Sequence, residues 1–360
     1  MSKDKNNFLS TAKGIGIILM VMGHSGVPGD IDKFIYQFHM PLFFFCSGYF
    51  LNNCENFNSI VTIIKKRFKG IYLKFLCWSI LFLALHNVFI YLNIYNDTIT
   101  KWAVYPYNIN DFVHRAIKII FSMNGHEQLV RSFWFFKQLF LASIIVPSII
   151  YITNKITHHK HAHLFVFMGL FLMTLISKYF NWALPAIWDI SLVFMSSTFY
   201  LSGYIFRKYN LLTKLNNITT SFLFFSFLII GLVYLPWTNM LEFTIITAIP
   251  FFIVAFSGTV LTLNISQVIE SYKIKYLFYY LGQNTLVIFA LHMLCFKIGN
   301  LLKILIYNYP MNRLAEFQII LDNNILFWII YTIIGITVPL FINYLMKKNI
   351  ITKRIWNYFV

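Results

Sequence analysis

Long apolar runs, separated by short polar stretches, recur along the whole chain. A run of roughly 17–25 mostly apolar residues is long enough to cross a bilayer as an α-helix. Such runs predict about ten transmembrane helices, at residues 12–27, 34–52, 71–95, 133–152, 163–181, 190–206, 219–237, 243–264, 283–304 and 325–346. No linker rich in Gly, Ser or Pro divides these runs, so we expect an all-α polytopic bundle that forms a single membrane domain over residues 1–360.

The longest polar connection, residues 96–132, contains a second kind of pattern. Within DFVHRAIKIIFSM (111–123), apolar residues recur at helical spacing. This spacing predicts a short amphipathic helix that lies along the membrane surface. A lid over a pocket is the alternative interpretation.

The composition supports a membrane protein. Hydrophobic residues make up 59% of the chain and charged residues only 11%, whereas soluble domains carry roughly 25% charged residues. The net charge of +17 would suit a nucleic-acid-binding protein, but basic residues cluster between apolar runs, at 65–69, 207–214 and 347–354. This distribution is typical of cytoplasmic loops. We therefore expect no nucleic-acid partner. The even number of spans puts both termini on one side of the membrane, and the distribution of Lys and Arg predicts that this side is the cytoplasm.

Metal and disulfide chemistry are not expected. The four cysteines are scattered without C-x-x-C spacing, which favours buried thiols. The histidine cluster THHKHAH (157–163) has no carboxylate or cysteine partner and is expected to be a solvated loop, so we predict no metal site.

Two ionisable residues bracket the first apolar run, KGIGIILMVMGH (13–24). Lys13 and His24 are 11 residues apart, and at about 100° per residue they lie on one helix face, separated by roughly 16 Å along the axis. An ionisable side chain within a span is a functional candidate, because it is costly unless it faces a polar interior. The imidazole of His24 gains and loses a proton near neutral pH and suits a general base. An inert, hydrogen-bonded histidine at the membrane interface is the alternative.

The second apolar run, FHMPLFFFCSGYF (38–50), supplies another histidine. We expect His39 to lie about one turn inside the membrane, at a depth similar to that of His24. Pro41 is expected to bend the helix there, and Ser47 and Gly48 permit another helix to approach closely. His39 is therefore a second catalytic candidate, as a partner, hydrogen-bond donor or relay for His24.

These two runs together resemble the integral-membrane acyltransferase 3 family, in its branch of fucose 4-O-acetylase-like or polysaccharide O-acetyltransferases. The resemblance rests on K-G-I-x-I-x-x-x-x-x-H in the first run and on F-H-M-P-L-F-F-F-x-S-G-Y-F in the second. It extends more weakly to FWFF (133–136) and LGQNTLVIFALH (281–292). It implies a multispan enzyme, with His24 as the catalytic residue and Lys13 as the family's basic residue of the first span.

The resemblance also implies a site for acetyl-CoA, the cytosolic acyl donor. A basic-x-x-basic pair after the second span falls on Lys66 and Lys69, with Arg67 between them, and these residues together with Lys13 would meet the phosphates. Lysines replace the arginines that are commoner in the family, so the bidentate contact of arginine is lost at two positions. A topology signal in contact with anionic lipids is the alternative interpretation.

Three further residues are candidates for contact with the substrate or with the catalytic residues. Trp134 lies in the FWFF motif, where an interfacial aromatic anchor explains it nearly as well. Asn284 and His292 lie about 80° apart on the ninth predicted span and share a broad polar face. The family's first span often carries a carboxylate before its basic residue, and this chain has none there.

These features together indicate an enzyme. Acyl transfer from a thioester to a sugar hydroxyl requires a base and positive charge or donors where oxyanion charge develops. We expect an O-acyltransferase of the bacterial cytoplasmic (inner) membrane, most simply an O-acetyltransferase, surrounded by membrane lipids and acting on a surface glycan or its lipid-linked precursor. A glycolipid or polysaccharide transporter that uses the histidines as a proton relay is the main alternative, and a sensing or scaffolding domain is a third.

Overall fold

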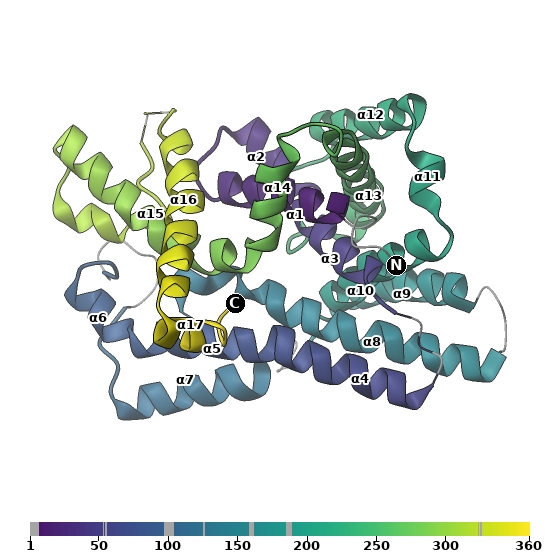
Figure 1. Ribbon diagram of the computed structural model, residues 1–360, viewed down its shortest axis with the longest axis horizontal. Helices are drawn as coiled ribbons and strands as arrows, with labels where there is room; N and C mark the ends of the chain where they lie inside the picture. Colours follow the sequence, from purple (N-terminus) through teal and green to yellow (C-terminus); the bar gives the residue numbers. More distant parts are fainter. Residues whose placement is uncertain are drawn as a thin grey trace. The chain divides into compact units, whose positions relative to one another are not determined.

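The computed structural model describes residues 7–52, 54, 56–96, 104–124, 127–157, 162–184, 189–322, 324 and 326–360. Throughout these ranges the regular structure is helical and no strand is present, which confirms the all-α prediction. The chain forms two compact units, whose helices can be followed by label in Figure 1. Unit 1 comprises Met1–Met20, Lys33–Tyr72 and Phe136–Gln283, and unit 2 comprises Val21–Asp32, Leu73–Phe135 and Asn284–Val360.

Five helical stretches among the described residues are long and apolar enough to cross a membrane. They are Gln128–Thr157, Ala162–Tyr179, Ile245–Ile269, Thr285–Tyr307 and Phe327–Lys348. Two shorter apolar helices, α1 (Asn7–Gly23) and α12 (Ile218–Tyr234), add to this set. The outward faces are apolar as well, as in Phe222 and Val233 of α12, which are 71% and 63% exposed. Apolar side chains exposed in this number are typical of surfaces that face lipid.

Two predicted spans are interrupted. The second is divided at Phe38, whose backbone (φ −144°, ψ −14°) separates α2 (Gly29–Tyr36) from α3 (His39–Tyr49). The third is divided between α5 (Leu73–Ala84) and α6 (His86–Tyr91). With 11 residues, α3 rises only about 16 Å, which is about half the thickness of the hydrocarbon core. Pro41 lies in the first turn of α3, and the interruption at Phe38 falls within four residues before it, where a proline disturbs a continuous helix.

Unit 1 is built around α10 (Ile190–Lys208), which is buried from Ser191 to Phe206. It packs against α3 and α9 (Ala162–Tyr179), and α13 (Ile245–Ile269) packs against α12 and α3. Glycines allow the closest approach: a Cβ on Gly48 would lie 1.7 Å from the carbonyl oxygen of Tyr200. Three side-chain hydroxyls along α10 bond to carbonyls one turn earlier, those of Ser196, Thr198 and Ser202, the last at 2.8 Å from the carbonyl of Thr198.

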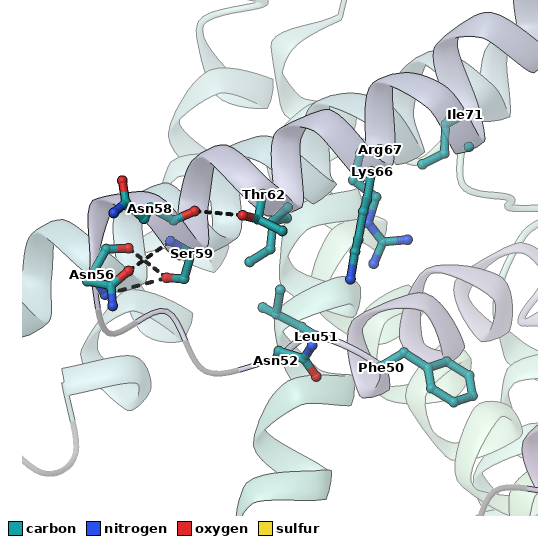
Figure 2. A pocket seen from close by; sticks show the side chains of 12 residues that line it. Phe50, Leu51, Asn52, Asn56, Asn58, Ser59, Thr62, Lys66, Arg67 and Ile71 are labelled. Atoms are coloured by element: carbon teal, nitrogen blue, oxygen red, sulfur yellow. Dashed lines mark hydrogen bonds between the residues drawn. The ribbon is translucent and has the colours of Figure 1, made fainter. Parts of the chain in front are cut away.

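The remaining helices of unit 1 lie on either side of this core. The basic helix α4 (Phe57–Arg67) begins with a capping box, in which Asn56 and Ser59 bond each other's backbone N–H groups (Figure 2). It continues into a short π-helix, Phe68–Tyr72. Unit 1 also contains α11 (Leu211–Leu215) and α14 (Lys275–Gln283), and α8 (Trp134–Thr157) begins two residues before the unit boundary.

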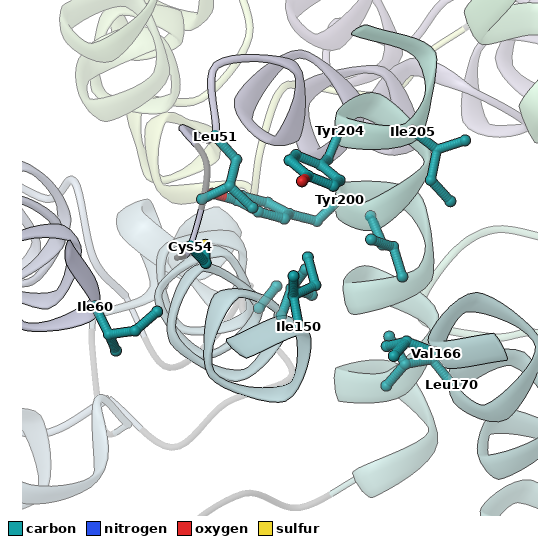
Figure 3. Close-up of a cluster of buried hydrophobic side chains, with 12 residues drawn as sticks. Leu51, Cys54, Ile60, Ile150, Val166, Leu170, Tyr200, Tyr204 and Ile205 are labelled. Carbon is teal, nitrogen blue, oxygen red and sulfur yellow. The ribbon is translucent and has the colours of Figure 1, made fainter. Parts of the chain in front are cut away.

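One hydrophobic cluster ties several of these elements together. In Figure 3, Tyr200 and Tyr204 of α10 extend beside Leu51, and Ile150 of α8 lies in the same cluster. The side chain of Tyr200 is fully buried. Because Leu51 follows α3 directly, this cluster anchors the segment that leads from α3 to α4.

Unit 2 is organised by α15 (Thr285–Tyr307), which packs against α16 (Phe327–Lys348) and against the short 3-10 helices Gln128–Phe133 and Met311–Ala315. The C-terminal helix α17 (Ile350–Trp356) packs against α16. A buried salt bridge between His86 and Glu127, at 2.7 Å, joins α6 to the segment before residue 128.

The predicted amphipathic helix is present as α7 (Ile109–Ser122), which packs against α5. Only Ile119 of this helix is buried, whereas Ile109, Val113 and Phe121 are exposed and share one face. This exposed apolar row is the face that an interfacial helix inserts into lipid.

Candidate functional site

Two histidines meet in unit 2. Helix α1 ends at Gly23, and His24 follows it in a turn closed by a hydrogen bond from its own N–H to the carbonyl of Val21, at 3.2 Å. His292 lies in the first half of α15 and is fully buried. The two imidazole rings stack with their centroids 5.3 Å apart and their planes 26° from parallel. His292, predicted as a supporting residue, is therefore in direct contact with the predicted base.

The hydrogen bonds of His292 define which of its nitrogens carries the proton. Its Nδ1 lies 2.9 Å from the carbonyl oxygen of Phe289 and 3.2 Å from that of Ile288. A carbonyl can only accept, so Nδ1 is the donor and the neutral ring has its lone pair on Nε2. Within the described residues Nε2 makes no hydrogen bond, so this buried nitrogen remains able to accept a proton.

His24 is oriented by a residue that the sequence did not identify. The side chain of Gln318 hydrogen bonds to the His24 ring. Gln318 belongs to residues 314–322, which lead from the end of the 3-10 helix Met311–Ala315 toward α16 and are here called the strap. A single glutamine in a mixed connection between two spans forms no motif, so no signal in the sequence pointed to it.

The strap is held by three polar side chains along α15. Lys297 donates to the carbonyls of Leu314 and Glu316, at 3.0 and 2.8 Å. Asn300 accepts from the N–H of Ile320 at 3.1 Å, and Lys303 donates to the carbonyl of Ile320 at 2.9 Å. These bonds satisfy the carbonyls and N–H groups of an irregular segment next to apolar helices, and they fix the part of the strap that carries Gln318.

An ion pair closes the end of the strap. Lys303 Nζ lies 2.7 Å from Asp322 Oδ1, and the two side chains are 3% and 11% exposed. Burial alone would raise the pKa of the Asp322 carboxyl, but hydrogen bonds from Lys303, Asn324 and Tyr309 hold that pKa below its usual range. Lys297 and Lys303 were missed, although the rule that singled out Lys13 and His24 applies equally to lysines within the ninth predicted span.

His39 belongs to unit 1, as the first residue of α3. It is buried, its Nδ1 lies 2.9 Å from the carbonyl oxygen of Ile35, and Tyr36 packs edge-on against the ring at 5.0 Å. His39 and His24 thus belong to different units, and the partnership predicted for them stays a prediction.

Lys13 also belongs to unit 1. It lies on α1 with its side chain partly buried, near the thiol of Cys46 on α3. Close contacts flank it: a Cβ on Gly14 would lie 2.1 Å from the carbonyl oxygen of Phe278 in α14. The predicted role of Lys13 in binding the acyl donor stays a prediction.

The basic residues after the second predicted span line a pocket in unit 1. This pocket has a volume of about 540 Å³, and Lys66 and Arg67 reach from α4 toward the segment Phe50–Asn52 (Figure 2). Arg67 donates to the hydroxyl of Tyr200 at 3.0 Å, which fixes its guanidinium, whereas Lys66 is exposed. Asn52, Asn56 and Ser59 add polar groups to the lining. Lys69 lies on the π-helix and does not line the pocket.

The remaining predicted residues lie in unit 2. Trp134 begins α8 and packs edge-on against Phe135, which in turn packs against Phe289 of α15. Asn284 precedes α15 and accepts a hydrogen bond from Asn343 of α16 at 2.8 Å, so it links these two helices. Residues 158–161 of the histidine cluster lie outside the described residues, and in the described ranges no group of three metal-ligating side chains occurs.

Comparison with known proteins gives one match. Residues 6–344 match the family model Acyl_transf_3, described as an acyltransferase domain. No curated protein and no solved structure matches the chain. The matched range includes residues of both units, and with them the histidine pair, the strap and the basic pocket.

Proposed function

Because the chain belongs to the acyltransferase 3 family, we propose that this membrane acyltransferase moves an acetyl group from acetyl-CoA to a hydroxyl of a bacterial surface glycan or of its lipid-linked precursor. The observation that carries the proposal is the imidazole of His24, which stacks on the buried ring of His292 and is hydrogen bonded by the side chain of Gln318. An acyl transfer to an alcohol needs a group of this kind to accept the hydroxyl proton.

In the proposed reaction His24 acts as the general base. It takes the proton of the acceptor hydroxyl as the oxygen attacks the thioester carbonyl carbon. A carbon–oxygen bond forms, the carbon–sulfur bond breaks, and the proton passes from His24 to the thiolate of CoA. Gln318 keeps the His24 ring oriented, and His292 supports it from its stacked position.

The acyl donor suits the basic pocket of unit 1. Acetyl-CoA carries several phosphates, and Arg67 and Lys66 present a guanidinium and an ammonium group to the same cavity. The hydrogen bond from Arg67 to Tyr200 holds the guanidinium in place before the ligand arrives, which reduces the entropy lost on binding. The predicted topology, with both termini in the cytoplasm of a bacterial inner membrane, places this pocket on the side where acetyl-CoA is made.

One experiment tests the proposal. The chain is expressed in a host from which its gene has been deleted, and the surface polysaccharide is examined by NMR for O-acetyl signals. We expect the intact chain to restore these signals and the H24A variant, at equal membrane abundance, to leave them absent. Acetylation that persists in H24A would refute the general-base assignment. Glycan transport without any O-acetyl ester would refute the enzyme and support a transporter.

A further inference from the structure

Unit 2 contains a pocket beside the histidine pair. Its volume is about 220 Å³, and its polar and aromatic lining comes from Ser25, Lys303, Asp322, Asn324, Trp328 and Tyr331. Two of the segments that form it also form the histidine site, because Ser25 follows His24 and Ile319 of the lining follows Gln318. The pocket is therefore lined by the residues that directly follow His24 and Gln318 in the chain.

The charges in this pocket cancel. The ammonium group of Lys303 pairs with Asp322 at 2.7 Å and also lies over the ring of Phe327, at 4.9 Å. The carboxylate of Asp322 is further occupied by the Tyr309 hydroxyl at 3.0 Å and by the backbone N–H of Asn324 at 2.9 Å. An anionic ligand would have to displace a buried, fully bonded carboxylate, so the pocket favours an uncharged one.

Hydrogen-bonding capacity remains beside this neutral pair. Lys303 has three N–H groups, and two of them are used by Asp322 and by the carbonyl of Ile320. The indole N–H of Trp328 has no hydrogen-bond partner in the described part of the chain, and its ring is only partly buried. The amide of Asn324 retains its oxygen as an acceptor. The pocket thus offers two donors and one acceptor, together with the indole ring of Trp328 in its lining.

We infer that this pocket binds the acceptor sugar, as a single uncharged pyranose ring. Such a ring has an apolar C–H face that packs on an aromatic side chain and a rim of hydroxyls that both donate and accept. The volume is below the roughly 300–1,000 Å³ of pockets for drug-sized ligands, which fits one ring rather than an oligosaccharide. The inference rests on the proposed acyl transfer, in which one of these hydroxyls gives its proton to His24.

The test uses the full chain in lipid nanodiscs, with ¹⁴C-acetyl-CoA as the donor and membranes of the deletion host as the source of acceptor. Acetyl transfer to the membrane fraction and equilibrium binding of acetyl-CoA are measured separately. We expect W328A to lower transfer by about 10–100-fold, because it removes both the ring and the donor, with donor affinity unchanged. W328F keeps a ring and loses only the N–H, and we expect a loss of about 3–10-fold.

The control is W182A, which removes a tryptophan of unit 1 that is 42% exposed, and we expect it to transfer acetyl as the intact chain does. The labelled product is then hydrolysed and the acetylated sugar identified. A neutral sugar supports the inference, and a uronic acid or a phosphorylated sugar overturns it.

Two further outcomes would overturn the inference. Normal transfer by W328A would show that the ring is not needed, and equal losses of transfer and of donor binding would indicate a merely structural role. An intact chain that binds no acetyl-CoA, or transfers no acetyl group, would instead refute the proposed function itself, so the two failures can be told apart.

Discussion

The two pockets of this molecule carry similar cations in opposite settings. In unit 1, Lys66 is exposed at the edge of the larger cavity, and no ion pair involving it occurs in the described residues. In unit 2, Lys303 is 3% exposed and paired with Asp322 beside the smaller cavity. An exposed, unpaired cation attracts anions from solution, whereas a buried and neutralised cation acts as a hydrogen-bond donor and a structural anchor.

This difference indicates which pocket each of the two substrates of the proposed reaction would bind. The polyanionic donor suits the basic pocket, and an uncharged hydroxyl-bearing acceptor suits the neutral pocket. Matched variants in the two units test this difference.

The largest expected effect concerns the histidines. H24A should lower the rate of acetyl transfer by about 10²–10⁴-fold, because this is the usual contribution of a general base. H292A, which removes the stacked partner, should lower it less. H39F in unit 1 should cost less than about tenfold if the base and its support lie in unit 2 alone. A loss in H39F as large as that in H24A would restore His39 as a catalytic partner, as the sequence predicted. Rates of ¹⁴C-acetyl transfer at equal protein concentration provide the measurement.

The second effect concerns stability. K303M should lower the free energy of unfolding by about 3 kcal/mol, because it leaves the partly buried Asp322 without its counter-charge. K66M, the same change at an exposed site, should alter it by less than about 0.5 kcal/mol. Thermal unfolding in detergent measures both.

A double variant provides the control for this stability comparison. K303M combined with D322L should recover most of the loss, since an apolar pair replaces the ion pair. Equal stability of K303M and K66M would contradict the distinction between the two cations.

The third effect is on donor affinity. R67A should weaken acetyl-CoA binding by about 10–100-fold, because a hydrogen bond to a charged group contributes about 1.5–3 kcal/mol. K69A should weaken it by less than about fivefold, since Lys69 does not line the pocket and a surface charge contributes about 0–1 kcal/mol. Equilibrium binding of labelled acetyl-CoA gives both values. A larger effect of K69A than of R67A would favour the basic-x-x-basic assignment made from the sequence.

The smallest expected effect is on the salt dependence. The Debye length falls from about 10 Å at 0.1 M to about 3 Å at 1 M ionic strength, so added salt should weaken donor binding several-fold. The apparent KM for the acceptor should stay constant over the same range, because the neutral pocket attracts no charge. Steady-state kinetics at several salt concentrations test this, and a parallel rise of both constants would contradict the assignment of the two pockets.

The fold was largely predictable from apolar runs, because helices in lipid require long segments without charge. The interruptions of the second and third predicted spans could not be predicted in this way. Phe38 lies between Gln37 and His39, three residues before Pro41, and the sequence did not show that the helix would be interrupted at this residue. The division into two units could not be predicted from the sequence either. The boundary falls within α1, after Met20, where no polar or glycine-rich segment marks it.

The candidate site was partly predictable for a similar reason. An imidazole near the end of an apolar run is visible in the sequence, and so is a basic cluster after it. The contact of His24 with His292 joins residues 268 positions apart and therefore depends on how the helices pack. Gln318 and Asp322 lie in a connection of mixed composition that contains no motif, so their roles depend on how this connection folds onto α15.

The lysines that hold the strap also have a consequence for how the protein is made. A lysine at the centre of a membrane helix opposes insertion by about 2.5–3.5 kcal/mol, and α15 carries Lys297 and Lys303. Their partners, the strap carbonyls and Asp322, are synthesised only after α15 has emerged from the ribosome. We therefore expect α15 to enter the bilayer together with the strap and α16 as a hairpin, and a chain truncated after Tyr307 to leave α15 outside the bilayer, where a membrane-impermeant reagent can label it.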